Sequence, residues 1–172
     1  IGNALEQRGI RVEYTRIGDI YNSPYEKAEI GNRSAADLFL SIHRNAMPVP
    51  GTGSGTMSLI FGRGGDAETF ARNINKELAK TGWKDLGISE RPNLVVLRDT
   101  ALPAVLVEVG FIDNENDNDF FDANMRQTAD AIADGIVRTF AEQEKQTSDV
   151  EEPGFYMVQT GIYRVRTNAE RE

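Results

Sequence analysis

Short apolar runs alternate with helical patterns along most of this chain, and this alternation constrains its fold more than any other feature. Residues 38–42 and 104–107 are apolar almost throughout and have the length of buried strands, and residues 94–97 form a third such run. Between them, residues 66–80 place large apolar side chains one helical turn apart, which predicts an amphipathic helix. Apolar strands separated by helices are typical of a mostly parallel sheet that is covered on both faces. The sequence therefore predicts an α/β domain with a mostly parallel twisted sheet and helices on both of its faces.

Weaker patterns complete the predicted domain. Residues 10–15 and 56–61 indicate further strands, and residues 25–36 and about 124–142 indicate helices. We assign residues 1–143 to this domain.

The composition changes after this domain. Residues 144–153 are polar and acidic, which predicts a linker. A new strand-like segment begins shortly afterwards, so residues 154–172 are predicted to be the start of an incomplete second domain.

Charge and residue usage exclude several classes of protein. The net charge of −8 disfavours nucleic acid as a partner, because phosphate binding needs clustered Lys and Arg. No apolar run approaches the roughly 18 residues that span a bilayer, so we expect no membrane insertion. The chain has no cysteine, which excludes thiolate metal ligands and cysteine nucleophiles. No export signal is visible, and we expect a monomer.

Two polar side chains follow the predicted buried strands. His43, the only histidine, comes directly after residues 38–42, and Glu108 comes directly after residues 104–107. The carboxyl ends of strands in open α/β sheets are where ligands and catalysis gather. An imidazole and a carboxylate at one sheet edge suit either a metal site or an acid–base pair. Two structural interpretations stay open: His43 only packs, or Glu108 caps backbone N–H groups or pairs with Arg98.

The residues around these positions resemble a known family. Residues 36–46 read ADLFLSIHRNA and residues 97–114 read LRDTALPAVLVEVGFIDN. Both stretches are similar to signature blocks of the zinc-dependent N-acetylmuramoyl-L-alanine amidases, in the same order, and the similarity extends over about residues 1–142. The resemblance implies that His43 is a zinc ligand and that Glu108 is the catalytic carboxylate.

The resemblance also implies a substrate and a place of action. Such an enzyme uses Zn2+ to hydrolyse the amide bond between the lactyl group of muramic acid and L-alanine in peptidoglycan. It would act in the bacterial cell wall or outside the cell. Asn45 and Arg98 lie beside the two key residues and are expected to help position the substrate, although tying down local loops is an equally open role.

The chain departs from the family pattern at its start. The family's first zinc ligand, the His of a GHGG motif, and its second, a Glu, are not present, and we expect them upstream of residue 1. His43 therefore supplies one of the three protein ligands that catalytic zinc usually has, and whether these residues alone are active stays open.

Three alternative functions are weighed, of which the first is supported by the missing ligands. One is a non-catalytic peptidoglycan-binding module with a degenerate metal site, and another is a different zinc hydrolase, such as a carboxypeptidase. A nucleotide-binding protein is disfavoured, because the glycines at 62–65 are not followed by the Lys-Ser/Thr of a phosphate-binding loop.

The end of the chain carries a second, shorter resemblance. Residues 155–163 and 168–170 resemble the opening of a sporulation-related repeat (SPOR) domain. That resemblance implies binding to glycan strands from which the peptides have been removed.

Overall fold

The chain is described by a computed structural model that covers residues 1–146 and 155–160. The elements in chain order are α1 (Gly2–Glu6), β1 (Arg11–Glu13), α2 (Pro24–Arg33), β2 (Ala36–Asn45), β3 (Thr56–Ile60), α3 (Asp66–Lys80), β4 (Asp85–Glu90), α4 (Val95–Arg98), β5 (Ala104–Phe111), α5 (Glu115–Gln146) and β6 (Phe155–Thr160).

Six strands form one sheet in the order β1-β6-β2-β5-β3-β4. All neighbouring strands run parallel except β3 and β5, which are antiparallel. The predicted mostly parallel α/β fold is therefore confirmed. The parallel pair β2 and β5 lies at the centre, so both strands end at the same edge of the sheet.

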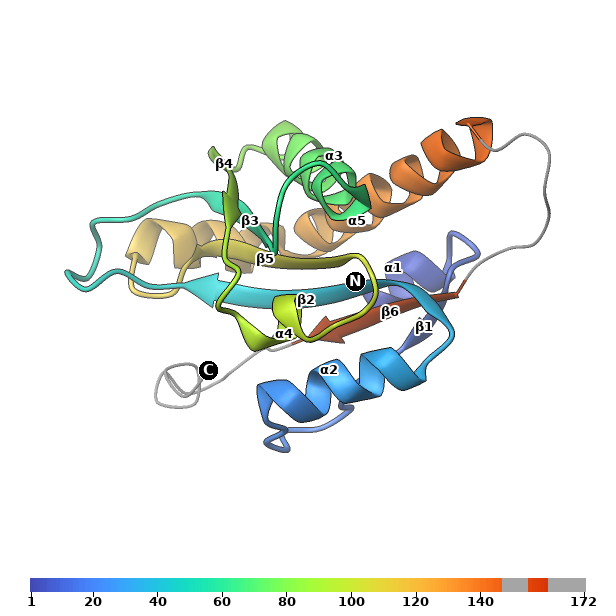
Figure 1. The fold of residues 1–172 in the computed structure, drawn as a ribbon. Helices are drawn as coiled ribbons and strands as arrows, with labels where there is room; N and C mark the ends of the chain where they lie inside the picture. The colour runs from blue at the N-terminus through green and yellow to red at the C-terminus, as the bar shows by residue number, and fades with distance from the viewer. Residues whose placement is uncertain (147–154, 161–172) are drawn as a thin grey trace.

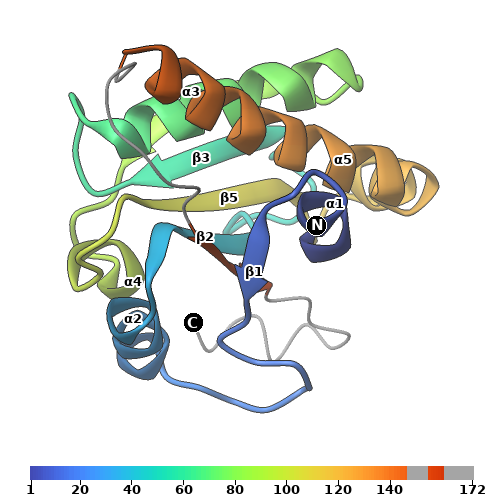
Figure 2. The same ribbon diagram turned by 90° about the vertical axis from the view of Figure 1, so that its right-hand side faces the viewer.

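Helices cover both faces of the sheet, as predicted. Figure 1 shows α1, α3 and α5 on one face, and α2 with α4 on the other; Figure 2 shows the same layers from the side. Alternate residues along β2 point into the two layers, because successive side chains of a strand face opposite ways. Leu38, Leu40 and Ile42 join the larger core beneath α3 and α5. Phe39 joins a smaller core with Val96 of α4 and Leu106 of β5.

The prediction and the structure differ at three elements. The apolar run at residues 94–97 was predicted to be a strand but forms the single helical turn α4, whose Val96 and Leu97 pack against one face of the sheet. Four apolar residues satisfy either kind of burial, so the pattern alone could not separate them. The edge strand β4 was not predicted, because its residues are polar and largely exposed. The helix α5 kinks at Asn124, so the predicted last helix corresponds to the segment after the kink, and the helical segment from Glu115 to the kink was not predicted.

The predicted second domain falls mostly outside the described residues. Of residues 154–172, the structure describes only Phe155–Thr160, which runs as β6 between β1 and β2. Most of the predicted linker, residues 147–153, also lies outside the described residues. Both assignments stay predictions. Within residues 1–146 and 155–160, none of the helices has the length and apolarity needed to cross a bilayer.

Candidate active site

A cavity of about 460 Å³ lies where β2 and β5 end. Its walls come from the first turn of α2, the last residues of β2, strand β3, the start of α4 and the end of β5. The sheet edge that the sequence predicted as the functional end is therefore hollow. Its lining includes both predicted key residues, His43 and Glu108.

The sheet itself sets these two residues side by side. His43 on β2 and Glu108 on β5 are partners in the parallel register. Both lie on the face of the sheet that α2 and α4 cover, and both line the cavity. The imidazole and the carboxyl group are thus brought together by strand pairing and not by a loop. Sites on paired strands hold their geometry more rigidly than sites on loops.

His43 is held in its uncharged form. Burial, with a smaller contribution from the nearby cations Lys27 and Arg16, lowers its pKa to about 4. Its Nε2 forms a 2.9 Å hydrogen bond with Oγ of Ser41, two residues earlier on the same face of β2. Ser41 is fully buried, so this bond fixes the ring against the sheet. A neutral imidazole is the form that binds metals.

Glu108 has the opposite character, because its environment favours the protonated form. Burial raises the pKa of Glu108 to about 7. Its Oε2 is buried and accepts no hydrogen bond from any side chain or backbone group in the described ranges. Leaving a buried carboxylate oxygen without a donor costs folding free energy, and such groups concentrate at functional sites. A carboxyl group that titrates near neutral pH can both accept and return a proton.

The two further predicted site residues, Asn45 and Arg98, lie in different places. Asn45 lines the cavity, where its Oδ1 accepts a 2.8 Å hydrogen bond from the backbone N–H of Ala46. Arg98 is not part of the cavity lining; it lies at the end of α4, where its side chain is paired with Asp99. Among the described residues, the ion pair of Arg98 is with Asp99 and not with Glu108. The structural interpretation in which Glu108 pairs with Arg98 therefore does not hold in this structure.

Sequence reasoning missed Lys27, which lines the cavity from α2 although its side chain is almost completely buried. Burial lowers the pKa of Lys27 to about 8, and the neighbouring Arg16 contributes to the same shift. Its place on the inward side of α2 with Ala28 and Gly31 was the available signal, because a lysine on the buried face of a helix is unusual. Sequence reasoning also missed the role of Ser41, which no pattern distinguishes from an ordinary buried serine.

A complete metal site is not formed by the part of the chain that the structure describes. No group of three or more His, Asp or Glu side chains there converges in a way that could hold a metal ion. The neutral His43 has the chemistry of one zinc ligand, but catalytic zinc usually needs three protein ligands. The described residues therefore fit a part of a zinc centre and not the whole of it.

The chain is similar to known amidases. Residues 1–138 match the family model described as N-acetylmuramoyl-L-alanine amidase. The chain is 31% identical over 169 residues to the N-acetylmuramoyl-L-alanine amidase CwlM of Bacillus licheniformis. It is 32% identical over 174 residues to the sporulation-specific N-acetylmuramoyl-L-alanine amidase of Bacillus subtilis. Each alignment covers 96% of this chain, which spans 62% of the length of each relative.

Solved structures show the same fold. The N-acetylmuramyl-L-alanine amidase of Mycobacterium smegmatis superposes with a TM-score of 0.74 at 26% identity, covering 82% of this chain and 72% of that one. Cwp6 of Clostridium difficile superposes with a TM-score of 0.73 at 34% identity, covering 79% of this chain and 23% of that one. Because the family model matches most of the chain, including the cavity residues, the chain belongs to the N-acetylmuramoyl-L-alanine amidase family.

Proposed function

We propose that the protein hydrolyses the amide bond between the lactyl group of N-acetylmuramic acid and L-alanine in peptidoglycan. The observation that carries this proposal is Glu108, a buried carboxyl group with a pKa of about 7 that faces the cavity beside His43 on a fold shared with amidases. We also propose that it acts as a monomer on the bacterial cell wall.

The proposed cofactor is Zn2+. His43 supplies one ligand, and the remaining protein ligands come from residues outside the described ranges, because those ranges hold no three-ligand group. When bound, zinc supplies a Lewis acid that polarises the amide carbonyl and makes a water molecule more acidic.

Glu108 moves the protons of the reaction. Its carboxylate takes one proton from the attacking water as the water oxygen bonds to the carbonyl carbon. The C–N bond then breaks, and the protonated Glu108 gives that proton to the nitrogen of the leaving alanine. The products are a lactyl carboxylic acid on the glycan and a peptide with a free amino terminus. A pKa near 7 suits both transfers, because neither protonation state is strongly favoured at neutral pH.

Asn45 is proposed to position the substrate. It lines the cavity, and its Oδ1 is already turned toward the backbone N–H of Ala46. That bond leaves the amide nitrogen, now 3.6 Å from Sδ of Met57, as the donor for a substrate carbonyl.

The test is to incubate the zinc-treated protein with purified peptidoglycan and to identify the new chain ends. The proposed reaction releases peptides whose amino-terminal residue is L-alanine, without new reducing sugar ends. Release of D-alanine or of internal peptide fragments would point to a peptidase such as a carboxypeptidase and would contradict the proposal.

A second candidate function is favoured by one observation, the incomplete metal-ligand set of the described residues. In that case the protein would bind peptidoglycan without cleaving it. Sedimentation with insoluble peptidoglycan, with no new L-alanine ends after long incubation with zinc, would favour this binding function over the amidase.

A further inference from the structure

Arg98 belongs to a small ordered cluster on the surface beside the cavity. Its guanidinium forms two hydrogen bonds with the carboxylate of Asp99, Nε to Oδ1 at 2.7 Å and Nη2 to Oδ2 at 3.1 Å. Asp99 contributes most to raising the pKa of this guanidinium, and Tyr25, the second residue of α2, lies close enough to Arg98 to contribute as well. The cluster of Tyr25, Arg98 and Asp99 therefore joins α2 to the end of α4.

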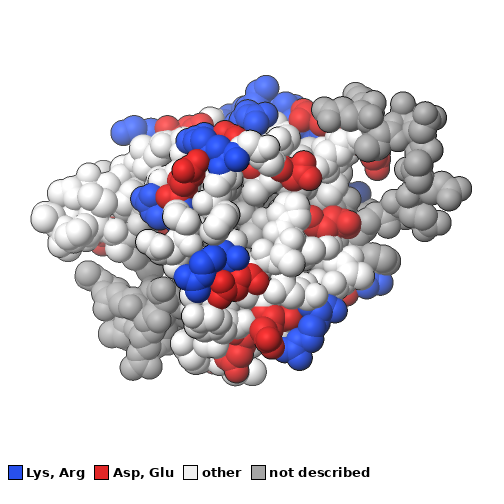
Figure 3. All heavy atoms as spheres, in the orientation of Figure 1, with Lys and Arg blue, Asp and Glu red and all other residues white. Residues whose placement is uncertain are grey.

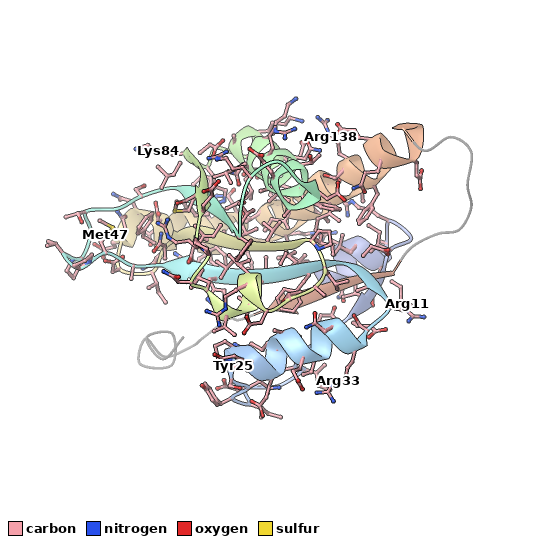
Figure 4. The ribbon with its side chains drawn as sticks, in the orientation of Figure 1. Arg11, Tyr25, Arg33, Met47, Lys84 and Arg138 are labelled. Carbon is pink, nitrogen blue, oxygen red and sulfur yellow. The ribbon has the colours of Figure 1, made fainter. Side chains whose placement is uncertain are left out.

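This cluster lies at the rim of the cavity. Pro24, the residue before Tyr25, lines the cavity, and so does Val95 at the start of the one-turn helix that ends at Arg98. Figure 4 shows Tyr25 at the end of α2 nearer α4, and Arg33 at the opposite end of the same helix. Tyr25 and Arg98 therefore stand beside the wall of the cavity to which α2 and α4 contribute.

The cluster is held in place before any ligand arrives. Nδ2 of Asn32, on α2, donates a 2.8 Å hydrogen bond to the carbonyl of Asp99. The backbone N–H of Ala101 donates a 2.7 Å hydrogen bond to Oδ1 of the same Asn32. These two bonds fix the segment after α4 onto α2. Binding there requires little ordering of side chains, which is a main cost of association.

The chemistry of the cluster suits a neutral sugar. Tyr25 is 59% exposed and offers a flat apolar ring with a polar tip. Asp99 balances the charge of Arg98, so the cluster offers planar donors and acceptors with no net charge of its own. The face shown in Figure 3 likewise carries interspersed acidic and basic side chains without a continuous patch of one sign. Such a surface gives an anionic ligand no electrostatic advantage.

We propose that Tyr25, Arg98 and Asp99 bind the glycan strand of peptidoglycan next to the bond that is cleaved. The apolar C–H face of one N-acetylated amino sugar packs on the ring of Tyr25. Its hydroxyl and amide groups bond with Arg98 and Asp99. This inference rests on the proposed function for the identity of the ligand, since the peptide side of the same substrate would occupy the cavity.

The experiment measures binding of a soluble oligosaccharide of N-acetylglucosamine to the 172-residue protein by calorimetry and by NMR titration. Tyr25→Ala removes the ring and is expected to weaken binding about fivefold or more. Tyr25→Phe keeps the ring and is expected to retain most of the binding. Arg98→Ala is expected to weaken binding by a smaller factor, because it removes hydrogen bonds and leaves the ring in place.

Arg33→Ala is the matched control. Arg33 lies on the same helix as Tyr25, pairs with Glu29 and has a side chain that is 73% exposed, so Arg33→Ala removes an exposed, ion-paired arginine as Arg98→Ala does. It lies at the far end of α2 from the cavity and is expected to leave binding unchanged.

The oligosaccharide of N-acetylglucosamine has no muramoyl–L-alanine bond, so its binding is measured independently of the proposed amidase activity. The inference is overturned if the wild-type protein does not bind the oligosaccharide, or if Tyr25→Ala binds it as tightly as the wild type. It is also overturned if the ring of Tyr25 is covered by a second copy of the chain, which would show as self-association that Tyr25→Ala abolishes. In each case the release of L-alanine ends would still test the amidase proposal.

Discussion

Two carboxyl groups near the end of β5, the buried Asp117 and the partly buried Glu108, have opposite surroundings. Asp117, at the start of α5, accepts a 2.7 Å bond from Oγ of Ser54 and bonds of 3.0 and 2.8 Å from the backbone N–H groups of Gly55 and Phe111. Glu108 faces the cavity from the other side of the strand, with a buried oxygen that accepts no bond within the described residues. Each oxygen of Asp117 is used to hold the β2–β3 loop and the end of β5 together.

The difference separates a structural carboxylate from a reactive one. Hydrogen bonds that satisfy a carboxylate stabilise the fold and remove its capacity to exchange protons with a ligand. An unsatisfied carboxyl group destabilises the fold but is ready to bond to whatever enters the cavity. The folding free energy lost at Glu108 therefore points to a function for this carboxyl group, and three tests examine the contrast with Asp117.

The largest expected effect is on catalysis at Glu108. In protein that releases L-alanine ends from peptidoglycan, Glu108→Gln is expected to lower the rate about 10²- to 10⁴-fold, because the amide cannot take the proton of the attacking water. Asp117→Asn, the matched control, is expected to retain most of the activity. Near-full activity of Glu108→Gln would show that Glu108 does not transfer protons in the reaction, and Glu108 would then not differ from Asp117 in function.

At Asp117 the expected effect is on stability instead. Asp117→Ala leaves the buried N–H groups of Gly55 and Phe111 without an acceptor and is expected to lower the free energy of unfolding by about 3 kcal/mol. Asp117→Asn should cost about 1 kcal/mol, because its amide oxygen can accept both N–H groups and its NH2 can donate to Ser54. Urea denaturation of the three proteins measures these differences. Equal midpoints for Ala and Asn would show that the bonds to Asp117 contribute little.

The pH dependence of stability is a third test, and its sign follows from the raised pKa of Glu108. The unfolded chain releases this proton near the usual pKa of 4.5, whereas the folded chain keeps it up to about 7. Over that window the folded state binds more protons, so stability falls as pH rises, by up to about 3 kcal/mol, and stays lower above pH 7.

Glu108→Gln cannot ionise and should lack this loss. Its stability relative to the wild type is therefore expected to grow between about pH 4.5 and pH 7, as measured by urea denaturation across that range. Parallel curves for the two proteins would mean that Glu108 ionises normally in the folded chain.

The sequence predicted the centre of this molecule better than its periphery. The apolar strands around residues 38–42 and 104–107 are buried on both faces, so their composition alone identified them, and their ends located His43 and Glu108. The run at residues 94–97 was misassigned because a helical turn against the sheet needs the same apolar residues as a strand within it. The edge strand β4 is paired on one side only and is largely exposed, so it carries no apolar pattern.

The candidate site was predictable in its key residues and not in their supports. His43 and Glu108 stand in two motif blocks, which a sequence displays directly. The burial of Lys27 was signalled only by its place beside Ala28 and Gly31 on α2, and the separation of Arg98 from the cavity depends on how distant segments pack. The bond between Ser41 and His43 is local to β2, but no sequence pattern marks which side chains on one face of a strand bond to each other.

The smallest expected effect is on the tautomer of His43 when Ser41 is replaced. Here the comparison is between two buried hydroxyl groups instead of two carboxyl groups. Oγ of Ser41 bonds to Nε2 of His43 at the cavity, whereas Oγ of Ser58, equally buried on β3, bonds to Oδ1 of Asn75 in the interior. If His43 is to offer Nδ1 to a metal, its proton must sit on Nε2 and be donated to Ser41. Since one hydrogen bond contributes about 1 kcal/mol, Ser41→Ala should change the ratio of the two imidazole tautomers about fivefold.

Nitrogen NMR can measure this ratio directly, because His43 is the only histidine in the chain and its ring signals need no assignment. The wild type is expected to show the proton on Nε2, Ser41→Ala a mixture of both tautomers, and Ser41→Thr, which keeps the hydroxyl, the wild-type pattern. Ser58→Ala removes a buried hydroxyl from the same sheet and should leave the imidazole signals unchanged. A wild-type proton on Nδ1 would mean that Ser41 donates to the ring, and Nδ1 could then not serve as the zinc-binding nitrogen without a change of tautomer.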